Sequence, residues 1–274
     1  MKVFISVDME GISGVVTGEQ TDESHPLYKN AQKWMIGDVN AAIDGALSAG
    51  AAEIIINDSH GKMTNLVLED LHPQAKLISG VNKPLFQMEG VQECDAAMFV
   101  GYHSRAGTSL TTLDHTYWGS LIDGLMVNGG EVGEPEFNAV LAGAFDVPVV
   151  FLSGDEVTCR EARAFIGKWL EVAAVKQAVG RCSAICLHPE VTAKLITDGA
   201  KRGLENLSTA RACTVDLPLT LDVRFRLTQM ADQGAVYPSA TRLDGRTVRI
   251  QAETVVDGYR AMLTLFALAR NAMP

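Results

Sequence analysis

The residues of this chain best suited to chemistry are two carboxylates near its start, Asp8 and Glu10. They follow the apolar stretch Val3–Val7, whose β-branched and aromatic residues predict a short buried strand. Residues two apart lie on the same side of an extended backbone, so both carboxylates face one direction. Two negative charges held this close repel each other and lose solvation unless a cation lies between them. The pair therefore indicates a metal site at the end of the first strand.

The six histidines divide into two groups by their neighbours. Three precede a proline, which favours turn backbone at the surface; these are His25, His72 and His188. His60, His103 and His115 lack a following proline. Of these, His60 and His103 follow apolar stretches at 53–57 and 96–101 that predict buried strands. Open α/β sheets bind ligands at this carboxyl edge, where the carboxylate pair also lies. Because imidazole nitrogen and carboxylate oxygen both bind zinc, and a carboxylate can bridge two ions, the edge predicts a metal site.

Several alternatives stay open at this edge. Asp58 is a rival ligand in the turn before His60, although aspartate is also an ordinary turn residue. Glu131 and Glu134 follow a glycine-rich turn, and neither is assigned as a ligand from the residues alone. A single histidine can also cap a turn or bind a buried carbonyl. The convergence of carboxylates and imidazoles from three strand ends favours metal binding over these structural roles.

The elements that must position these residues alternate between strand and helix in the first half of the chain. Besides the three strands above, apolar runs at 77–80 and 147–152 predict strands, and helical spacing predicts a helix over 31–51. Nearly continuous apolar strands that alternate with helices are typical of an α/β fold. We expect a mostly parallel sheet covered by helices.

The second half of the chain has a different pattern, with alternating strands and amphipathic helices. Its predicted elements are helices at 158–174, 191–207 and 255–270, and strands at 214–227 and 248–252. We therefore expect a smaller α+β C-terminal portion, with an α/β metal-binding domain at 1–156 and the smaller portion at 157–274, or one compact unit.

Composition limits the possible partners. The 274 residues carry 33 acidic and 23 basic side chains, a net charge of -10 without a basic block, which argues against nucleic-acid and membrane partners. The sequence starts with a predicted strand instead of a signal peptide, and no apolar run could span a membrane. Five irregularly spaced cysteines fit a reducing compartment, so a cytoplasmic protein is expected. Cys182 and Cys186 lack a second ligand pair and flank a predicted buried strand, which indicates a structural role.

A set of short motifs resembles the D-aminopeptidase family (peptidase family M55). The motifs are Ser6-x-Asp8-x-Glu10-Gly11, Asn57-Asp58-Ser59-His60, Gly101-Tyr102-His103, His115 and Val132-Gly133-Glu134. The resemblance implies a binuclear zinc aminopeptidase that assembles into a ring-shaped homo-oligomer, a decamer. Carried over by position, it implies two zinc ions per subunit and these zinc ligands: Asp8, Glu10, His60, His103 and Glu134. His115 would be the catalytic histidine.

The expected function is hydrolysis of the N-terminal residue of short peptides or amino-acid amides, with D-residues as a possible preference. A metal-activated water would attack the scissile carbonyl, with His115 assisting as general acid/base or acting as the nucleophile itself. The same ligands would also accept manganese or cobalt. Two alternatives are another binuclear metallohydrolase, such as an amidase, and a non-catalytic metal- or peptide-binding scaffold.

Overall fold

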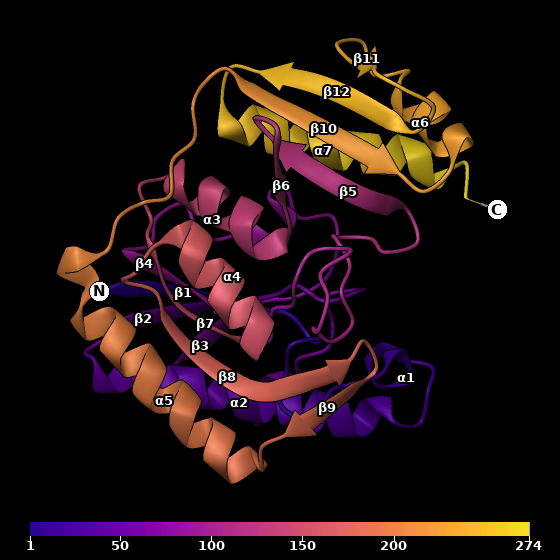
Figure 1. The fold of residues 1–274 in the computed structure, drawn as a ribbon. Helices are drawn as coiled ribbons and strands as arrows, with labels where there is room; N and C mark the ends of the chain where they lie inside the picture. The colour runs from indigo at the N-terminus through magenta and orange to yellow at the C-terminus, as the bar shows by residue number, and fades with distance from the viewer. Residues whose placement is uncertain (274) are drawn as a thin grey trace.

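A computed structural model describes residues 1–273 of the chain, which form two β-sheets (Figure 1). The larger sheet has seven strands, in the order β3 (Ala75–Ile78), β2 (Glu53–Asp58), β1 (Lys2–Val7), β4 (Ala96–Val100), β7 (Val149–Asp155), β8 (Glu171–Gly180) and β9 (Ser183–Cys186). All neighbouring pairs are parallel except β8 and β9. The expected α/β fold with a mostly parallel sheet is confirmed.

The strand order explains where a site forms. The chain runs outward from β1 to β2 and β3, then returns to place β4 on the other side of β1. Val7 at the end of β1 consequently pairs with Asp58 of β2 and with Val100 of β4. Such a reversal of strand order leaves a crevice at the carboxyl ends of the central strands. The segments that follow β2, β1 and β4 therefore meet at one place.

Helices cover both faces of this sheet. On one face lie α2 (Tyr28–Ser48) and α5 (Pro189–Glu205), and on the other lie α3 (Glu134–Gly143) and α4 (Glu156–Ile166). The period-two alternation of β1 distributes its side chains accordingly. Ile5 is buried in the core beneath α2 and α5, whereas Phe4 is buried in the core beneath α3 and α4. Because both faces are buried, the interior of β1 is mainly apolar, with Ser6 as a buried polar residue.

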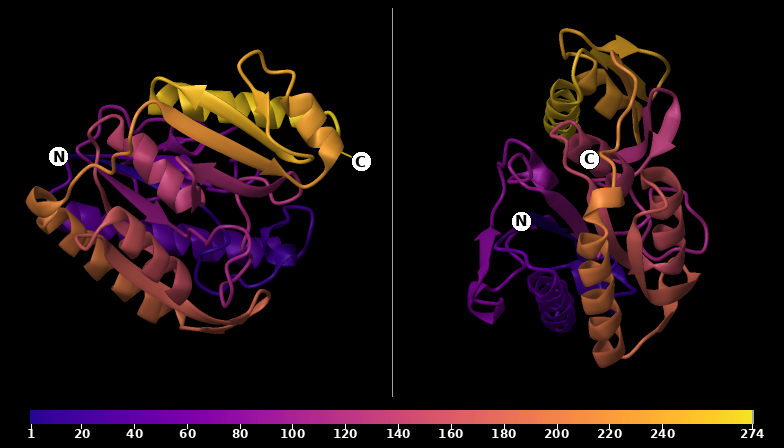
Figure 2. Two further views of the ribbon diagram at one scale, coloured as in Figure 1. Left: turned by 45° about the horizontal axis from the view of Figure 1, so that its top comes forward. Right: turned by 90° about the vertical axis from the view of Figure 1, so that its left-hand side faces the viewer.

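The smaller sheet is antiparallel, in the order β11 (Thr241–Arg242), β12 (Thr247–Ala252), β10 (Leu219–Phe225), β5 (Ile122–Val127) and β6 (Gly130–Val132). The helices α6 (Thr228–Gly234) and α7 (Val255–Arg270) pack against it, and this unit lies at the top of Figure 1 and of Figure 2. The expected α+β character of the C-terminal portion is confirmed. Each sheet contains strands from before and from after residue 156. The division into domains at 1–156 and 157–274 stays a prediction.

Short helices complete the chain: α1 (Gly18–Thr21) and 3-10 helices at Leu68–Asp70, Phe86–Met88 and Leu207–Thr209. No helix among the described residues is both long enough and apolar enough to cross a membrane.

Three local predictions were wrong. The helix predicted over 158–174 ends at Ile166, because Gly167 adopts a φ of 143° and stops it. The following apolar residues form β8, which pairs with β7. The strand predicted from residue 214 begins only at Leu219, after Pro218, which has no N–H to donate to a ladder. The segment between Cys182 and Cys186 forms strand β9 as expected, but it is exposed, not buried.

Candidate metal centre

The carboxylate pair lies in a tight turn directly after β1. The strand ends at Val7, so Asp8 and Glu10 are held by the turn and not by extended backbone as predicted, yet they still reach the same cluster. The turn packs closely against the end of β4. A Cβ atom on Gly11 would lie 1.9 Å from the carbonyl oxygen of Tyr102, and one on Gly101 would lie 2.3 Å from that of Asp8. Both positions therefore require glycine.

Asp8 lies between two histidines that come from different strands. Its Oδ1 is 3.2 Å from Nδ1 of His60, which follows β2, and its Oδ2 is 3.3 Å from Nε2 of His103, which follows β4. Glu10 Oε2 is 3.0 Å from the same nitrogen of His60. Glu134 Oε1 is 3.2 Å from the same nitrogen of His103. The five residues thus form two adjacent groups that share Asp8.

Glu134 reaches this cluster from a different part of the fold. The β5–β6 hairpin directs the chain back toward the sheet, and Glu134 is the first residue of α3, followed by Pro135, which suits the first turn of a helix. Gly133 allows the close approach, because a Cβ atom there would lie 2.8 Å from the Cβ of Arg105. Glu134 is 1% exposed, so its charge needs partners within the protein.

Backbone carbonyls fix which nitrogen of each imidazole faces the cluster. His60 Nε2 lies 3.0 Å from the carbonyl of Thr21, and His103 Nδ1 lies 3.0 Å from that of Ser104. A carbonyl only accepts, so each of these nitrogens carries a proton and donates it. In a neutral imidazole the other nitrogen then presents a lone pair to the carboxylates. This arrangement of a histidine held by a hydrogen bond at its outer nitrogen is typical of metal ligands.

The charges of the cluster are strongly interdependent. Burial disfavours protonation of His60 and His103, but the facing carboxylates outweigh burial and raise the pKa of both imidazoles well above the usual range. Burial likewise opposes ionisation of Glu10, but the neighbouring His60 outweighs it and lowers the pKa of this carboxyl. The pKa of Glu134 is also lowered against the effect of burial, chiefly by His103. The site thus favours positive charge between its carboxylates, which a divalent cation supplies.

The donor set fits metal binding in two further respects. Among the described residues, Glu10 Oε2 and His103 Nε2 are buried and lack any hydrogen bond of acceptable geometry. Unpaired buried polar atoms are costly, and these two point at the cluster. Two sets of three residues, which share His103, bring their donor atoms within 4.8 Å of one another. They are Asp8, Glu10 and His103, and also His103, His115 and Glu134. Carboxylate and imidazole in this combination are zinc ligands.

His115 lies beside the cluster on the loop between β4 and β5. Its Nε2 is 3.8 Å from Glu134 Oε1, and its ring stacks on that of His103. Its Nδ1 lies 2.9 Å from the carbonyl of Leu113, which places the proton there and the lone pair on Nε2. The Leu113 N–H in turn donates to the carbonyl of Arg181, in the β8–β9 turn.

Two acidic residues anchor the loop that carries His115. Asp155, at the end of β7, accepts hydrogen bonds from the hydroxyl groups of Thr111 and Thr112. Asp114 accepts a hydrogen bond from Arg181 Nε at 2.8 Å. The Asp114 carboxylate is thus bonded to Arg181 and to the backbone N–H of Gly107, and not to the His115 ring.

The remaining sequence candidates lie outside the cluster. Asp58, the rival ligand, accepts hydrogen bonds from the backbone N–H groups of Asn65 and Leu66 and holds the loop that contains His60. Glu131 is exposed and pairs with Arg105. The three histidines that precede prolines belong to neither metal-binding group: His25, His72 and His188. His188 caps the N-terminus of α5.

Sequence reasoning missed one buried cation near the site. Lys176 of β8 is 2% exposed, and its Nζ donates to the backbone carbonyls of Glu10, Ile12 and Val15. Burial lowers the pKa of this ammonium to about 8. Lys176 thereby holds the turn after β1 in place through these three carbonyl groups. No sequence signal marked it, because its segment adjoins the region assigned to a helix.

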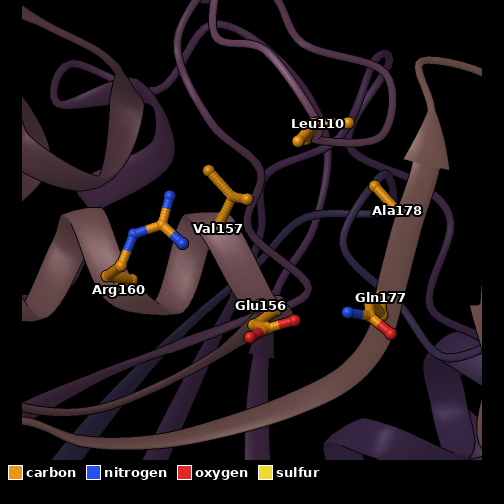
Figure 3. A pocket seen from close by; sticks show the side chains of 6 residues that line it. All are labelled: Leu110, Glu156, Val157, Arg160, Gln177 and Ala178. Atoms are coloured by element: carbon orange, nitrogen blue, oxygen red, sulfur yellow. The ribbon is translucent and has the colours of Figure 1, made fainter.

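A surface pocket of about 230 Å³ lies between the β4–β5 loop, α4 and β8 (Figure 3). Its lining residues are Leu110, Glu156, Val157, Arg160, Gln177 and Ala178. None of them is a candidate ligand. The chemistry of this chain is therefore assigned from the clustered donor atoms and not from this pocket.

A carboxylate–histidine cluster at the switch point of an open α/β sheet is the arrangement of a metal-dependent enzyme. A family model described as D-aminopeptidase (Peptidase M55) matches residues 1–264. A D-aminopeptidase of Bacillus subtilis (strain 168) is 36% identical over 274 residues, which cover 98% of each chain. The chain belongs to the D-aminopeptidase family, as its motifs predicted, and is a hydrolase of that kind.

A solved structure is also similar over nearly the whole chain. It is that of the Zn-dependent D-aminopeptidase DppA from Bacillus subtilis, described as a self-compartmentalizing protease. The two folds agree with a TM-score of 0.95 at 35% sequence identity, over 98% of each chain. The similarity includes both sheets, so the fold assignment extends to the C-terminal portion.

Proposed function

We propose that this chain is a zinc-dependent D-aminopeptidase whose centre binds two zinc ions per subunit. Asp8, Glu10 and His60 would hold one ion, and Asp8, His103 and Glu134 would hold the other. The observation that carries the proposal is the position of Asp8, whose two oxygens face histidines of different strands. The zinc dependence named for the Bacillus subtilis relative supports the choice of metal.

Bound zinc supplies Lewis-acid polarisation of the scissile carbonyl and makes water acidic enough to react near neutral pH. The protein must then hold the peptide, and move protons around the reacting carbonyl. The net charge of -10 gives the chain an acidic character that suits the free ammonium group of a substrate. This preference fits removal of an N-terminal residue from short peptides or amino-acid amides.

His115 is the residue we assign to proton transfer. The Leu113 carbonyl keeps the proton on Nδ1, so Nε2 enters the centre as a base. It could accept a proton as the carbonyl is attacked and return it to the departing amine. Direct attack by the same lone pair on the carbonyl would be the nucleophilic version of this role. In either version His115 acts on the substrate and is not needed to bind metal.

We also propose that the chain works as a homo-oligomer, with a decamer as the expected size. The relative described as a self-compartmentalizing protease supports assembly. The β8–β9 hairpin carries apolar side chains that are open to solvent in a single subunit, among them Val179 and Ile185, at 63% and 60% exposure. Burying such side chains favours association. Light scattering of the purified protein would measure the size.

The proposed activity is tested with matched D- and L-alanyl amides and dipeptides. Zinc-loaded protein should release alanine, preferentially from the D-compounds, and a chelator should abolish release until zinc is restored. His72→Ala, outside the centre, is the matched control for the loss expected of His60→Ala. If no chelator-sensitive release occurred from any compound, the proposal would be wrong.

A further inference from the structure

Both oxygens of the Glu134 carboxylate have fixed partners. Oε1 lies 3.2 Å from His103 Nε2 and accepts a hydrogen bond from the backbone N–H of Tyr117 at 2.6 Å. Oε2 accepts a hydrogen bond from Nε2 of Gln87 at 2.5 Å. Gln87 belongs to the 3-10 helix between β3 and β4 and is 3% exposed. The orientation of the Gln87 amide therefore decides whether Glu134 Oε2 faces its N–H donor or its oxygen.

The hydrogen-bond directions around Gln87 follow from donor and acceptor counting. The backbone carbonyl of Gln87 only accepts, and the nearer of its two hydroxyl partners, Ser6 at 2.8 Å compared with Ser59 at 3.2 Å, donates to it. Ser6 has used its single proton, so Tyr102, whose hydroxyl is 2.7 Å from Ser6 Oγ, must donate to it. Tyr102 has then used its proton as well. Its oxygen can only accept from Asn138 Nδ2, at 3.0 Å.

Asn138 of α3 uses its full hydrogen-bonding capacity in this position. It is fully buried, and its Nδ2 donates to Tyr102 and, at 2.7 Å, to Oε1 of Gln87. Its Oδ1 accepts from the hydroxyl groups of Tyr117 at 2.9 Å and Tyr259 at 3.2 Å. With its oxygen facing Asn138, the Gln87 amide has only one orientation, which presents its Nε2 donor to Glu134. Tyr259 lies on α7, so the C-terminal helix takes part in this orientation.

We propose that Gln87 and Asn138 are positioning residues that set the direction of the Glu134 carboxylate and thereby the metal affinity of the centre. The proposal rests on the assignment of Glu134 as a metal ligand under the proposed function. The effect of the two amides passes through one hydrogen bond to Glu134 Oε2, which leaves Oε1 directed at His103 and the centre. The network also assigns a role to α7, which contributes no candidate ligand.

The test is a double-mutant cycle on zinc affinity, measured by competition with a chromophoric chelator. Gln87→Met removes the donor to Glu134, and we expect affinity for the zinc beside His103 to fall about 10- to 100-fold. Asn138→Leu, which has a similar shape, should lower affinity in the same direction because it releases the Gln87 amide. The double variant should be no weaker than the weaker single variant, since both remove the same effect on Glu134.

The control is Thr192→Val, which removes a buried hydroxyl bonded to Pro189 in α5. It should leave zinc affinity unchanged. Unchanged affinity in Gln87→Met, or losses that add in the double variant, would overturn the proposal, because a purely structural role predicts either result. If Asn138→Leu does not fold, Gln87→Met alone decides.

Glu134→Ala separates this inference from the proposed function. If Glu134→Ala keeps both zinc ions, the ligand assignment itself is wrong. If it loses zinc while Gln87→Met binds zinc as tightly as the parent protein, only the positioning role is wrong.

Discussion

The imidazole rings of His103 and His115 are stacked with their centroids 4.0 Å apart and their planes at 13°. Both donate from Nδ1 to a backbone carbonyl, and both direct Nε2 at Oε1 of Glu134, at 3.2 Å and 3.8 Å. They differ in burial, since the His103 side chain is 1% exposed and that of His115 is 19% exposed. A buried ring suits a metal ligand and a more open one suits contact with substrate. We therefore assign different roles to two similar side chains.

Replacing each ring by alanine separates the two roles. His103→Ala should lose zinc together with activity, whereas His115→Ala should keep near-parental zinc and lose at least about 100-fold in kcat, the effect of removing a general acid/base. Metal analysis and steady-state assays on the same preparations measure both. Finding His115→Ala depleted of zinc would show instead that His115 is a ligand.

The shared position of Asp8 predicts unequal effects of the two carboxylates of the opening motif. Asp8→Ala should lose both zinc ions, because each ion loses a ligand. Glu10→Ala should lose mainly the ion beside His60 and keep the one beside His103. Zinc per subunit after gel filtration measures the difference. Equal loss in the two variants would rule out the bridging role of Asp8.

Removal of the buried lysine should loosen the turn that holds the carboxylate pair. Lys176→Met leaves three backbone carbonyls without their donor, which we expect to lower the free energy of unfolding by roughly 2–4 kcal/mol. Zinc affinity should fall as well, since one of these carbonyls belongs to Glu10. Urea unfolding and chelator competition measure the two effects, with the exposed Lys168→Met as control. A variant with parental stability and affinity would contradict this role.

A buried aspartate gives the protein a predictable pH dependence. Burial raises the pKa of Asp38 from its ordinary 3.8 to about 6, although the backbone and hydroxyl of Ser13 donate to it. Between these two values the folded state binds more protons than the unfolded state, so this carboxyl favours folding less as pH rises. Asp38→Asn lacks this titration. As pH rises from 4 to 7, the free energy of unfolding of this variant should therefore increase by up to about 3 kcal/mol relative to that of the parent.

The measurement is urea unfolding of both proteins across that range, with Asp44→Asn on the exposed face of α2 as control. A stability difference between Asp38→Asn and the parent that stays constant with pH would contradict the raised pKa.

The sequence predicted those parts of the site that lie at strand ends. Asp8, Glu10, His60 and His103 each follow a short apolar strand, and parallel packing brings such ends together whatever the details of the loops. Glu134 could not be assigned this way. It follows a hairpin of the other sheet and begins a helix, so only the family resemblance marked it.

The features that depend on tertiary contacts had no sequence signal. Residues 172–175 are apolar enough for a buried helix or a strand, and pairing with β7 makes them part of β8. Gln87 and Asn138 are isolated amides whose importance arises from their burial beside Glu134. Lys176 follows the predicted helix at 158–174 without any motif around it. Its role arises only because the fold buries it against the turn after β1.

The most direct test of the two-metal centre is a zinc-loaded crystal structure with anomalous diffraction recorded at the zinc absorption edge. We predict two zinc peaks per subunit, both bound by Asp8, one also by Glu10 and His60 and the other also by His103 and Glu134. His115 should bind neither ion. A single peak, or a peak bound through His115 in place of Asp8, would contradict the account.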